Sequence, residues 1–405
     1  MTMHDVVVVG ARCAGAATAR LLAQKGYRVV MLDHATFPSD MPMSTHLLWH
    51  AGATRLKQWG LLETLIASGC PPIRDVSLDL GAFRLVGRPP SDGADAAYAP
   101  RRKVLDTILV DAAVEAGVAL RQDFTVDDVV RDGDRIVGVT GHQRGGTPET
   151  VLGRIVIGAD GRTSRIARAV SAATYNEMPE LQGIRFSYFS GVPMSGMEFI
   201  PGMSRMVFAW PTHDGLTLVG IAWAIADFHA IRDDVEGHFY AELDKWAPDL
   251  AGRVRAGTRE DAWLGGAVEN FCRKPYGPGW ALVGDAGLTM DPITAAGITD
   301  AFRDAELLAS AVDDGLSGRR DMIDALAEFE QKRNESSLPV YSFATQMAQL
   351  APPPPEVQQL LGALQHNQAD TDQYFGVFAQ TVPVTQFFDP ANLARIVTQA
   401  AAANA

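Results

Sequence analysis

The beginning of the chain constrains the fold more than any other feature, because a strand, a glycine-containing turn, a helix and a second strand follow one another before residue 34. Residues Asp5–Val9 are a run of valines typical of a strand buried in a parallel sheet. An Ala- and Leu-rich helix is predicted over Ala14–Gln24, and a second apolar strand over Arg28–Asp33. This order predicts a β-α-β unit and therefore an α/β fold with a parallel sheet.

The turn in this unit has the spacing of a dinucleotide-binding fingerprint. It reads Gly10-Ala11-Arg12-Cys13-Ala14-Gly15, and Asp33 stands 23 residues after its first glycine. In such folds the first glycine permits a sharp turn, the last permits close helix–strand packing, and the acidic residue binds a ribose hydroxyl. The free amides of the helix start suit a pyrophosphate. Arg12 replaces the middle glycine, so its charge either offsets that loss or points toward the active site. The alternative is an ordinary turn without a ligand.

Two later segments also end a buried strand in a polar turn. A strand over Ile155–Asp160 breaks at Asp160-Gly161, and a strand over Trp280–Leu282 runs into Gly284-Asp285. The loop Asp291–Gly297 then leads into a long helix, whose N-terminus can stabilise negative charge on a bound ring. Each pattern alone also fits a structural turn or a cap. In this order after the first motif, they indicate one extended ligand site.

The three motifs together resemble the superfamily of FAD-dependent monooxygenases typified by para-hydroxybenzoate hydroxylase, with its geranylgeranyl-reductase and halogenase branches. The resemblance covers the chain to about residue 330. It implies that the first motif binds the ADP part of a non-covalent FAD. It also implies that Asp160-Gly161 supports the pyrophosphate and the approach of NAD(P)H, and that Gly284-Asp285 holds the ribityl chain. The cofactor-binding residues that it implies are Gly10, Ala11, Arg12, Cys13, Ala14, Gly15, Asp33, Arg102 (with Arg101 as the near alternative), Asp160, Gly161, Gly284, Asp285, Pro292, Ala296, Gly297 and Ile298.

Branch markers within this superfamily point in two directions. Many of its hydroxylases carry a histidine where this chain has Leu288, and Asp291-Pro292 resembles the reductase and halogenase branches. No halogenase-type Trp-x-Trp-x-Ile-Pro motif occurs, and Phe208-Ala209-Trp210-Pro211 matches only part of a reductase-type strand. The leading hypothesis is an FAD-dependent monooxygenase that uses NAD(P)H and O2 to hydroxylate an aromatic or other planar apolar molecule through a flavin C4a-hydroperoxide. The alternatives are a geranylgeranyl-reductase-like ene-reductase and a redox-silent FAD-binding protein.

The substrate pocket is expected between the flavin and an inserted sheet. Its predicted lining residues are Thr45, Trp49, Phe186, Trp210 and Trp223, each of which could instead be ordinary core. His46 is the candidate catalytic base, because an ordinary imidazole pKa near 6.5 suits phenol deprotonation. The alternative is a packed, hydrogen-bonded histidine.

The domain organisation follows from the change of pattern along the chain. We expect a discontinuous Rossmann-like FAD-binding domain over residues 1–72, 96–174 and 276–330. An antiparallel β-sheet substrate domain is inserted as residues 73–95 and 175–275, and residues 331–405 form a helical C-terminal segment. A single helix is predicted over Asp234–Val254, and a hairpin turn at Asp214-Gly215.

Composition limits the partners. The chain has 405 residues and a net charge of −13, which argues against nucleic acid or an anionic membrane surface as a main partner. No apolar stretch reaches the ~20 residues of a membrane helix, so no integral membrane contact is expected. The three cysteines have neither disulfide-framework nor metal-site spacing, and no metal site is predicted. With no secretory signal at the N-terminus, the expected location is the cytoplasm.

Overall fold

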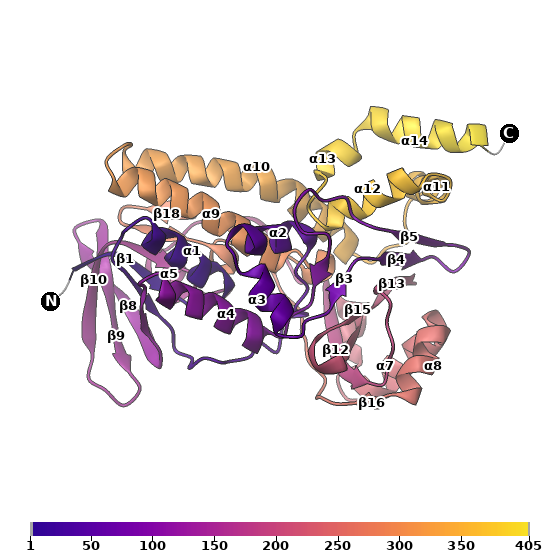
Figure 1. Ribbon diagram of the computed structural model, residues 1–405, viewed down its shortest axis with the longest axis horizontal. Helices are drawn as coiled ribbons and strands as arrows, with labels where there is room; N and C mark the ends of the chain where they lie inside the picture. The colour runs from indigo at the N-terminus through magenta and orange to yellow at the C-terminus, as the bar shows by residue number, and fades with distance from the viewer. Residues whose placement is uncertain (1–2, 404–405) are drawn as a thin grey trace.

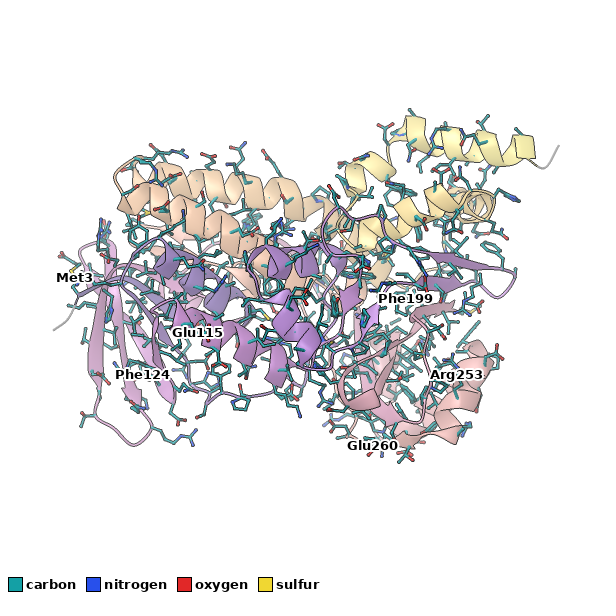
Figure 2. All side chains as sticks on the ribbon, in the orientation of Figure 1. Met3, Glu115, Phe124, Phe199, Arg253 and Glu260 are labelled. Carbon is teal, nitrogen blue, oxygen red and sulfur yellow. The ribbon has the colours of Figure 1, made fainter. Side chains whose placement is uncertain are left out.

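The computed structural model describes residues 3–403, which form two sheet-centred lobes and a group of C-terminal helices (Figure 1). Figure 2 labels Glu115 and Phe124 in the first lobe and Phe199 and Arg253 in the second. The α/β fold predicted from the sequence is confirmed.

The first lobe is built on an eight-stranded mixed sheet. Strand β1 (Met3–Val9) lies between β10 (Glu149–Gly158) and β2 (Val29–Leu32) and is parallel to both. The parallel set continues with β19 (Trp280–Leu282) beside β10 and β7 (Ala119–Arg121) beside β2. Three antiparallel strands complete the sheet: β8 (Phe124–Asp132), β9 (Arg135–Gln143) and β18 (Tyr276–Gly277). The carboxyl ends of β1, β10 and β19 therefore meet at one edge, where the three motifs begin.

The alternation of β1 explains its run of valines, because both faces of this strand are buried. Val6 and Val8 lie in a core cluster with helix residues, while Val7 and Val9 lie in a second cluster with Phe124 of β8. The helices of the first face are α1 (Cys13–Gln24), α4 (Arg102–Glu115) and α9 (Gly297–Leu316), with α10 (Met322–Ala348) packed on α9.

The second lobe contains a seven-stranded sheet in the order β16-β12-β15-β14-β13-β4-β5. The strands are β16 (Thr258–Arg259), β12 (Gln182–Ser190), β15 (Thr217–Ala224), β14 (Arg205–Pro211), β13 (Met197–Gly202), β4 (Val76–Asp79) and β5 (Arg84–Gly87). Asp214 and Gly215 have φ of 62° and 67° between β14 and β15, which confirms the predicted turn.

Helices cover both faces of this second sheet. One face packs on α7 (Val235–Trp246) and α8 (Pro248–Ala256). The prediction of one helix over Asp234–Val254 is wrong, because Pro248 starts a new helix and cannot donate to the preceding turn. The other face packs against Leu47 and Trp49 and against the C-terminal helices α11 (Pro355–Leu364), α12 (Gln368–Phe378), α13 (Val384–Phe387) and α14 (Pro390–Ala403).

The boundary of the C-terminal helical segment and the remaining short elements complete the description of the fold. Helix α10 runs without a break past residue 330, so the C-terminal helical segment starts inside this helix rather than at a loop. The remaining elements are α2 (His50–Gln58), α3 (Leu62–Ala67), α5 (Arg165–Ala169), α6 (Ile225–Ala230), β3 (Pro72–Ile73), β6 (Ala97–Tyr98), β11 (Thr174–Met178), β17 (Asn270–Arg273), β20 (Leu288–Thr289) and the 3₁₀ turns η1 (His213–Gly215), η2 (Gly284–Ala286) and η3 (Pro292–Thr294).

Candidate functional site

The three motifs meet through close glycine contacts. A Cβ added to Gly10 would lie 2.3 Å from the carbonyl oxygen of Ala159, and one added to Gly15 would lie 1.9 Å from that of Gly10. A Cβ at Gly284 would lie 2.8 Å from that of Ala14. Larger side chains would therefore push the motifs apart. The contacts of Gly15 fit the close helix–strand packing predicted for it, and the φ of +101° at Gly10 fits the predicted sharp turn.

The carboxylate of Asp33 holds the first turn in place. It accepts hydrogen bonds from the backbone N–H of Ala11 at 2.7 Å and of Ala35 at 2.8 Å, and the residue is buried. Asp33 therefore stabilises the glycine turn by accepting from two backbone N–H groups, a role that was not predicted. Its contact with a ribose stays a prediction.

Arg12 points away from the turn toward α4. It donates to Asp106 Oδ2 at 2.8 Å and to Ser39 Oγ at 3.0 Å. Asp106 is fully buried and also accepts from Arg102 and from the Cys13 thiol at 3.3 Å. The charge of Arg12 therefore joins α1 to α4, which is neither of the two roles predicted for it. Asp106 was not predicted as a site residue, and its only sequence signal is its position four residues after Arg102 on a helix.

Asp285 combines solvent access with desolvation. Its side chain is exposed, yet burial among the surrounding protein atoms raises its pKa, with Arg102 opposing and Asp300 reinforcing the shift. Among residues 3–403 nothing donates a hydrogen bond to its carboxylate. A ligand hydroxyl would satisfy it, so the residue fits the ribityl chain of FAD.

Asp160 and Gly161 have different roles in their turn. Asp160 accepts from Ser164 Oγ at 2.6 Å and from the backbone N–H of Arg165 at 2.7 Å, so it orders the start of α5. Burial raises the pKa of Asp160, and these bonds oppose that shift. Gly161 has φ of +77° and a Cβ there would meet no atom within 4 Å, which leaves space for a ligand beside the backbone.

The segment before α9 is shaped by a left-handed residue. Ala295 has φ of 51°, and α9 begins two residues later at Gly297, where a Cβ would again meet no atom within 4 Å. Trp49 Nε1 donates to the carbonyl oxygen of Thr294 at 2.9 Å. The exposed amides of this helix start can face a negatively polarised ring edge, which fits the predicted position of the flavin's pyrimidine beside Pro292, Ala296, Gly297 and Ile298.

His46 is held in an unusual environment. The residue is 2% exposed, has φ of 66°, and its Nε2 shares a hydrogen bond with the hydroxyl of Tyr188. Burial, assisted by Arg102, lowers the pKa of His46 to about 3. The imidazole is therefore neutral at neutral pH, and the premise of an ordinary pKa near 6.5 is wrong because that premise ignored desolvation. Its Nδ1 has no partner among the described residues.

Four of the five predicted pocket residues lie together, and one does not. Trp49, Phe186 and Trp210 belong to one buried cluster, and Trp210 Nε1 donates to the carbonyl oxygen of Thr45 at 3.2 Å. Trp223 instead packs with Phe239 on the opposite face of the sheet, toward α7 and α8.

Tyr188 and Arg101 extend this aromatic cluster, and sequence reasoning did not place them there. Tyr188 lies 6.0 Å from Phe186 in an edge-on arrangement, and the Arg101 guanidinium lies 4.0 Å from the centre of the Tyr188 ring. Arg101 also pairs with Asp40 at 3.3 Å and with Asp261 at 3.6 Å. Arg101 thus faces the aromatic cluster, while its neighbour Arg102 faces Asp106 and Asp285. The alternation of phenylalanine and tyrosine along β12 was the available signal for Tyr188.

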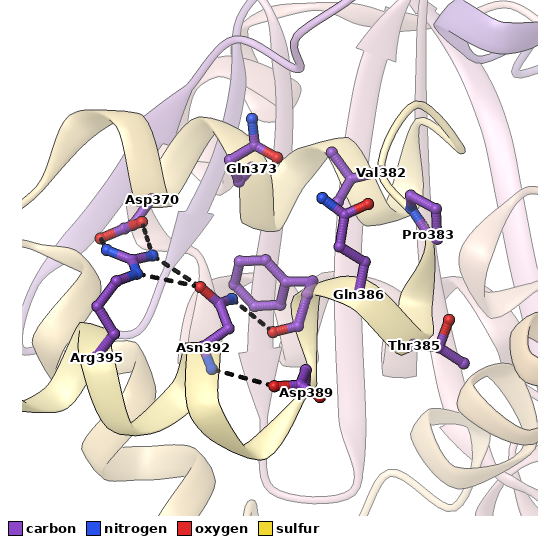
Figure 3. Close-up of a pocket in the computed structure, with 10 residues that line it drawn as sticks. Asp370, Gln373, Val382, Pro383, Thr385, Gln386, Asp389, Asn392 and Arg395 are labelled. Atoms are coloured by element: carbon purple, nitrogen blue, oxygen red, sulfur yellow. Dashed lines mark hydrogen bonds and ion pairs between the residues drawn. The ribbon is translucent and has the colours of Figure 1, made fainter.

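A separate hollow of about 740 Å³ lies between α12, α13 and α14 (Figure 3). Arg395 Nη2 lies 2.6 Å from Asp370 Oδ1, and the third charged residue, Asp389, accepts from the backbone N–H of Ala391 at 2.9 Å. Asn392 is also engaged, through its bond to the carbonyl oxygen of Phe387 at 2.8 Å. This hollow contains none of the residues predicted for the functional site.

Other classes of site find little support in residues 3–403. No helix in that part of the chain is both long and apolar enough to cross a membrane. No cluster of three or more His, Cys, Asp or Glu suited to a metal occurs there either. Cys13, Cys70 and Cys272 are free thiols, and all three are buried.

The fold and the three motifs at the strand ends are those of a flavin-dependent oxidoreductase. Residues 3–343 match the family described as FAD binding domain. The chain belongs to this family, and with it to the superfamily of FAD-dependent monooxygenases typified by para-hydroxybenzoate hydroxylase. It is an FAD-dependent enzyme.

Two curated relatives are reductases. Menaquinone reductase of Mycolicibacterium smegmatis is 27% identical over 332 residues, covering 78% of this chain and 77% of that protein. Digeranylgeranylglycerophospholipid reductase 1 of Methanococcoides burtonii is 26% identical over 344 residues, covering 82% of this chain and 79% of that protein.

Solved structures share the fold across nearly the whole chain. The flavin-dependent brominase Bmp2 has a TM-score of 0.80 at 18% identity, covering 100% of this chain and 99% of the brominase. PqsL of Pseudomonas aeruginosa, in complex with 2-aminobenzoylacetate, has a TM-score of 0.73 at 21% identity, covering 93% of this chain and 100% of PqsL.

Proposed function

We propose that this enzyme is an FAD-dependent monooxygenase that uses NAD(P)H and O2 to hydroxylate an aromatic or other planar apolar small molecule. The observation that carries the proposal is the bond from Trp49 Nε1 to the Thr294 carbonyl oxygen. This bond joins the aromatic cluster directly to the segment expected to face the flavin. When bound, FAD supplies the hydride and oxygen chemistry, which no side chain can provide.

The residues of the chain bind and orient the reactants. Asp285 would hold a ribityl hydroxyl of the cofactor, and the helix start at Gly297 would face its pyrimidine edge. Phe186 and Tyr188 offer an aromatic wall for the substrate and keep water out of the site. His46 is neutral and bonded to Tyr188, so it orients the phenolic hydroxyl.

Substrate turnover under isotopically labelled O2 tests the reaction. A screen of aromatic compounds that follows NAD(P)H oxidation and oxygen uptake together identifies the substrate, and mass spectrometry of the product then shows whether one labelled atom is incorporated. Labelled water with ordinary O2 is the matched control. A product that never carries the label contradicts the proposal.

A reductase that saturates a carbon–carbon double bond is the second candidate. It is favoured by the Asp291-Pro292 pair and by the names of the two curated relatives. Turnover measured without oxygen distinguishes the two candidate reactions, because a reductase needs no oxygen and a monooxygenase does. In that case hydride would go to an alkene and no labelled atom would be incorporated.

The compartment that we propose is the cytoplasm. Three buried free thiols support a reducing environment, because thiols stay reduced there.

A further inference from the structure

A buried acid–amide pair connects the segment before α9 to the second sheet. Gln182, the first residue of β12, donates from Nε2 to Asp291 Oδ1 at 2.6 Å. The two residues are 1% and 0% exposed. Asp291 directly precedes Pro292, and Gln182 lies on the strand that carries Phe186. The pair therefore joins the expected flavin contact to the expected substrate wall.

Asp291 also fixes the local shape of its own segment. Its Oδ1 accepts from the backbone N–H of Ile293 at 3.0 Å and caps η3. Its backbone N–H donates to Asn270 Oδ1 at 2.6 Å. Movement of Asp291 would thus change the path of residues 292–297, including the left-handed Ala295.

Burial of this pair is energetically unfavourable if its role is only to stabilise the fold. Asp291 Oδ2 and Gln182 Oε1 are buried without a partner among the described residues. Burial raises the pKa of Asp291 to about 7, and no basic side chain offsets its desolvation. Apolar side chains of similar volume often stabilise a fold as well as or better than buried polar groups with unmet bonds. A role beyond stability is therefore indicated.

We propose that Gln182 and Asp291 are a positioning pair that sets the register of the substrate strand against the flavin-facing segment. The proposal rests on the proposed flavin position, and it is independent of the choice between hydroxylation and reduction. Neither residue needs to touch the substrate. Their effect passes through Pro292 and the start of α9 on one side and through β12 on the other. A second bond, from Trp210 to Thr45, joins the same sheet to the loop before α2.

The first test compares bound flavin in Gln182→Met with the wild type. This change keeps the chain length of the side chain and removes its hydrogen bond. The visible circular dichroism of bound FAD is expected to change, and the FAD dissociation constant to rise about fivefold to tenfold, as for the loss of one buried hydrogen bond. Gln182 is outside the three FAD motifs, so these changes report the link to Asp291.

Thr217→Val is the matched control, because Thr217 Oγ1, at the start of β15 in the same sheet, donates to the carbonyl oxygen of Val192 in the loop after β12 at 2.7 Å. This control is expected to lower Tm and leave the flavin spectrum unchanged. If Gln182→Met behaves like Thr217→Val, with only Tm affected, the positioning role is refuted.

The second test exchanges the two groups in the double variant Gln182→Glu and Asp291→Asn. One acid and one amide remain, so this variant stays informative even if Gln182→Met does not fold. The flavin circular dichroism and the FAD dissociation constant are expected to return to within twofold of the wild type. A folded double variant with a persistently altered flavin overturns the proposal. Absence of FAD binding by the wild-type protein would refute the proposed function itself, and is seen before either variant is made.

Discussion

At the scale of single residues, surroundings decide the chemistry of the site more than residue type does. His46 has the side chain of a base near neutral pH, but burial lowers its pKa to about 3. Asp285 shows the opposite displacement, since burial raises the pKa of its carboxyl. Residue type could be read from the sequence. Desolvation could not, because it depends on segments that are far away in the chain.

Replacing His46 should separate flavin reduction from product formation. His46→Ala removes the hydrogen-bond partner of Tyr188 and should lower product formation by about fivefold to a hundredfold, because the buried phenolic hydroxyl is then left without its partner. Reduction by NAD(P)H should persist, with hydrogen peroxide replacing product. Parallel assays of peroxide and product measure the coupling. Tyr188→Phe, which removes the same bond from the other side, should behave similarly, and full coupling in both variants would leave this bond a purely structural role.

Asp285→Asn should weaken FAD binding without lowering the thermal stability of the apoprotein. A charge-assisted bond to a flavin hydroxyl contributes about 1.5–3 kcal/mol, so affinity should fall about tenfold to more than a hundredfold. The pKa of Asp285 is raised in the fold, so its ionised form opposes folding at pH 7 and its removal should raise the Tm of the apoprotein. FAD titration by fluorescence and thermal unfolding measure the two effects.

Asp33→Ala is the comparison variant for that experiment. It should lose both affinity and stability, because the Asp33 carboxylate holds the backbone of Ala11 and Ala35. Unchanged FAD affinity in the Asp285 variant would contradict a flavin whose ribityl chain lies against this carboxylate.

At the scale of elements, local sequence patterns predicted most strands and helices, but they did not predict which residues contact each other between these elements. The valine run of β1 and the helix after it were readable, because burial on two faces and an Ala-rich sequence are local signals. The break between α7 and α8 was missed, since the amphipathic pattern continues across Pro248. The bond from Arg12 to Asp106 joins residues 94 positions apart, and no local rule predicts it.

The junction of α1 and α4 should depend on that shared carboxylate. Asp106→Asn leaves the buried Arg102 and the partly buried Arg12 without their counter-charge. Removal of one partner from a buried ion pair costs about 3–5 kcal/mol, so urea unfolding should show a large loss of stability. Glu149→Gln is the control variant. It breaks the surface ion pair with Arg121 and should leave the midpoint of urea unfolding nearly unchanged. Equal effects of the two variants would show that Asp106 adds no more than a surface pair.

At the scale of the whole molecule, the proposed site lies between the two large sheets, and this is the part that the sequence predicted least well. Trp210 and Trp223 both lie on strands of the second sheet, yet they face opposite sides. Side chains alternate along a strand, so choosing the buried side that meets the flavin requires the packing of the whole sheet. The motif order indicated the FAD domain, while only the assembled molecule distinguishes a pocket residue from core.

The stability of the whole protein should fall on mild acidification partly through its buried histidines. The unfolded chain binds a proton at His46 near pH 6.5, whereas the fold lowers the pKa of His46 to about 3 and that of His50 to about 4. The unfolded state therefore binds more protons between these values, and each histidine should reduce stability by up to about 1.4 kcal/mol per pH unit below pH 6.5. Asp291 acts with the opposite sign, because its pKa of about 7 means that the fold holds a proton which the unfolded chain releases above pH 4. Urea unfolding at pH 7, 6 and 5 should give a smaller acid loss for His46→Gln than for the wild type. The exposed His238→Gln, on α7, should follow the wild type, and an equal slope in all three proteins would contradict a buried neutral His46.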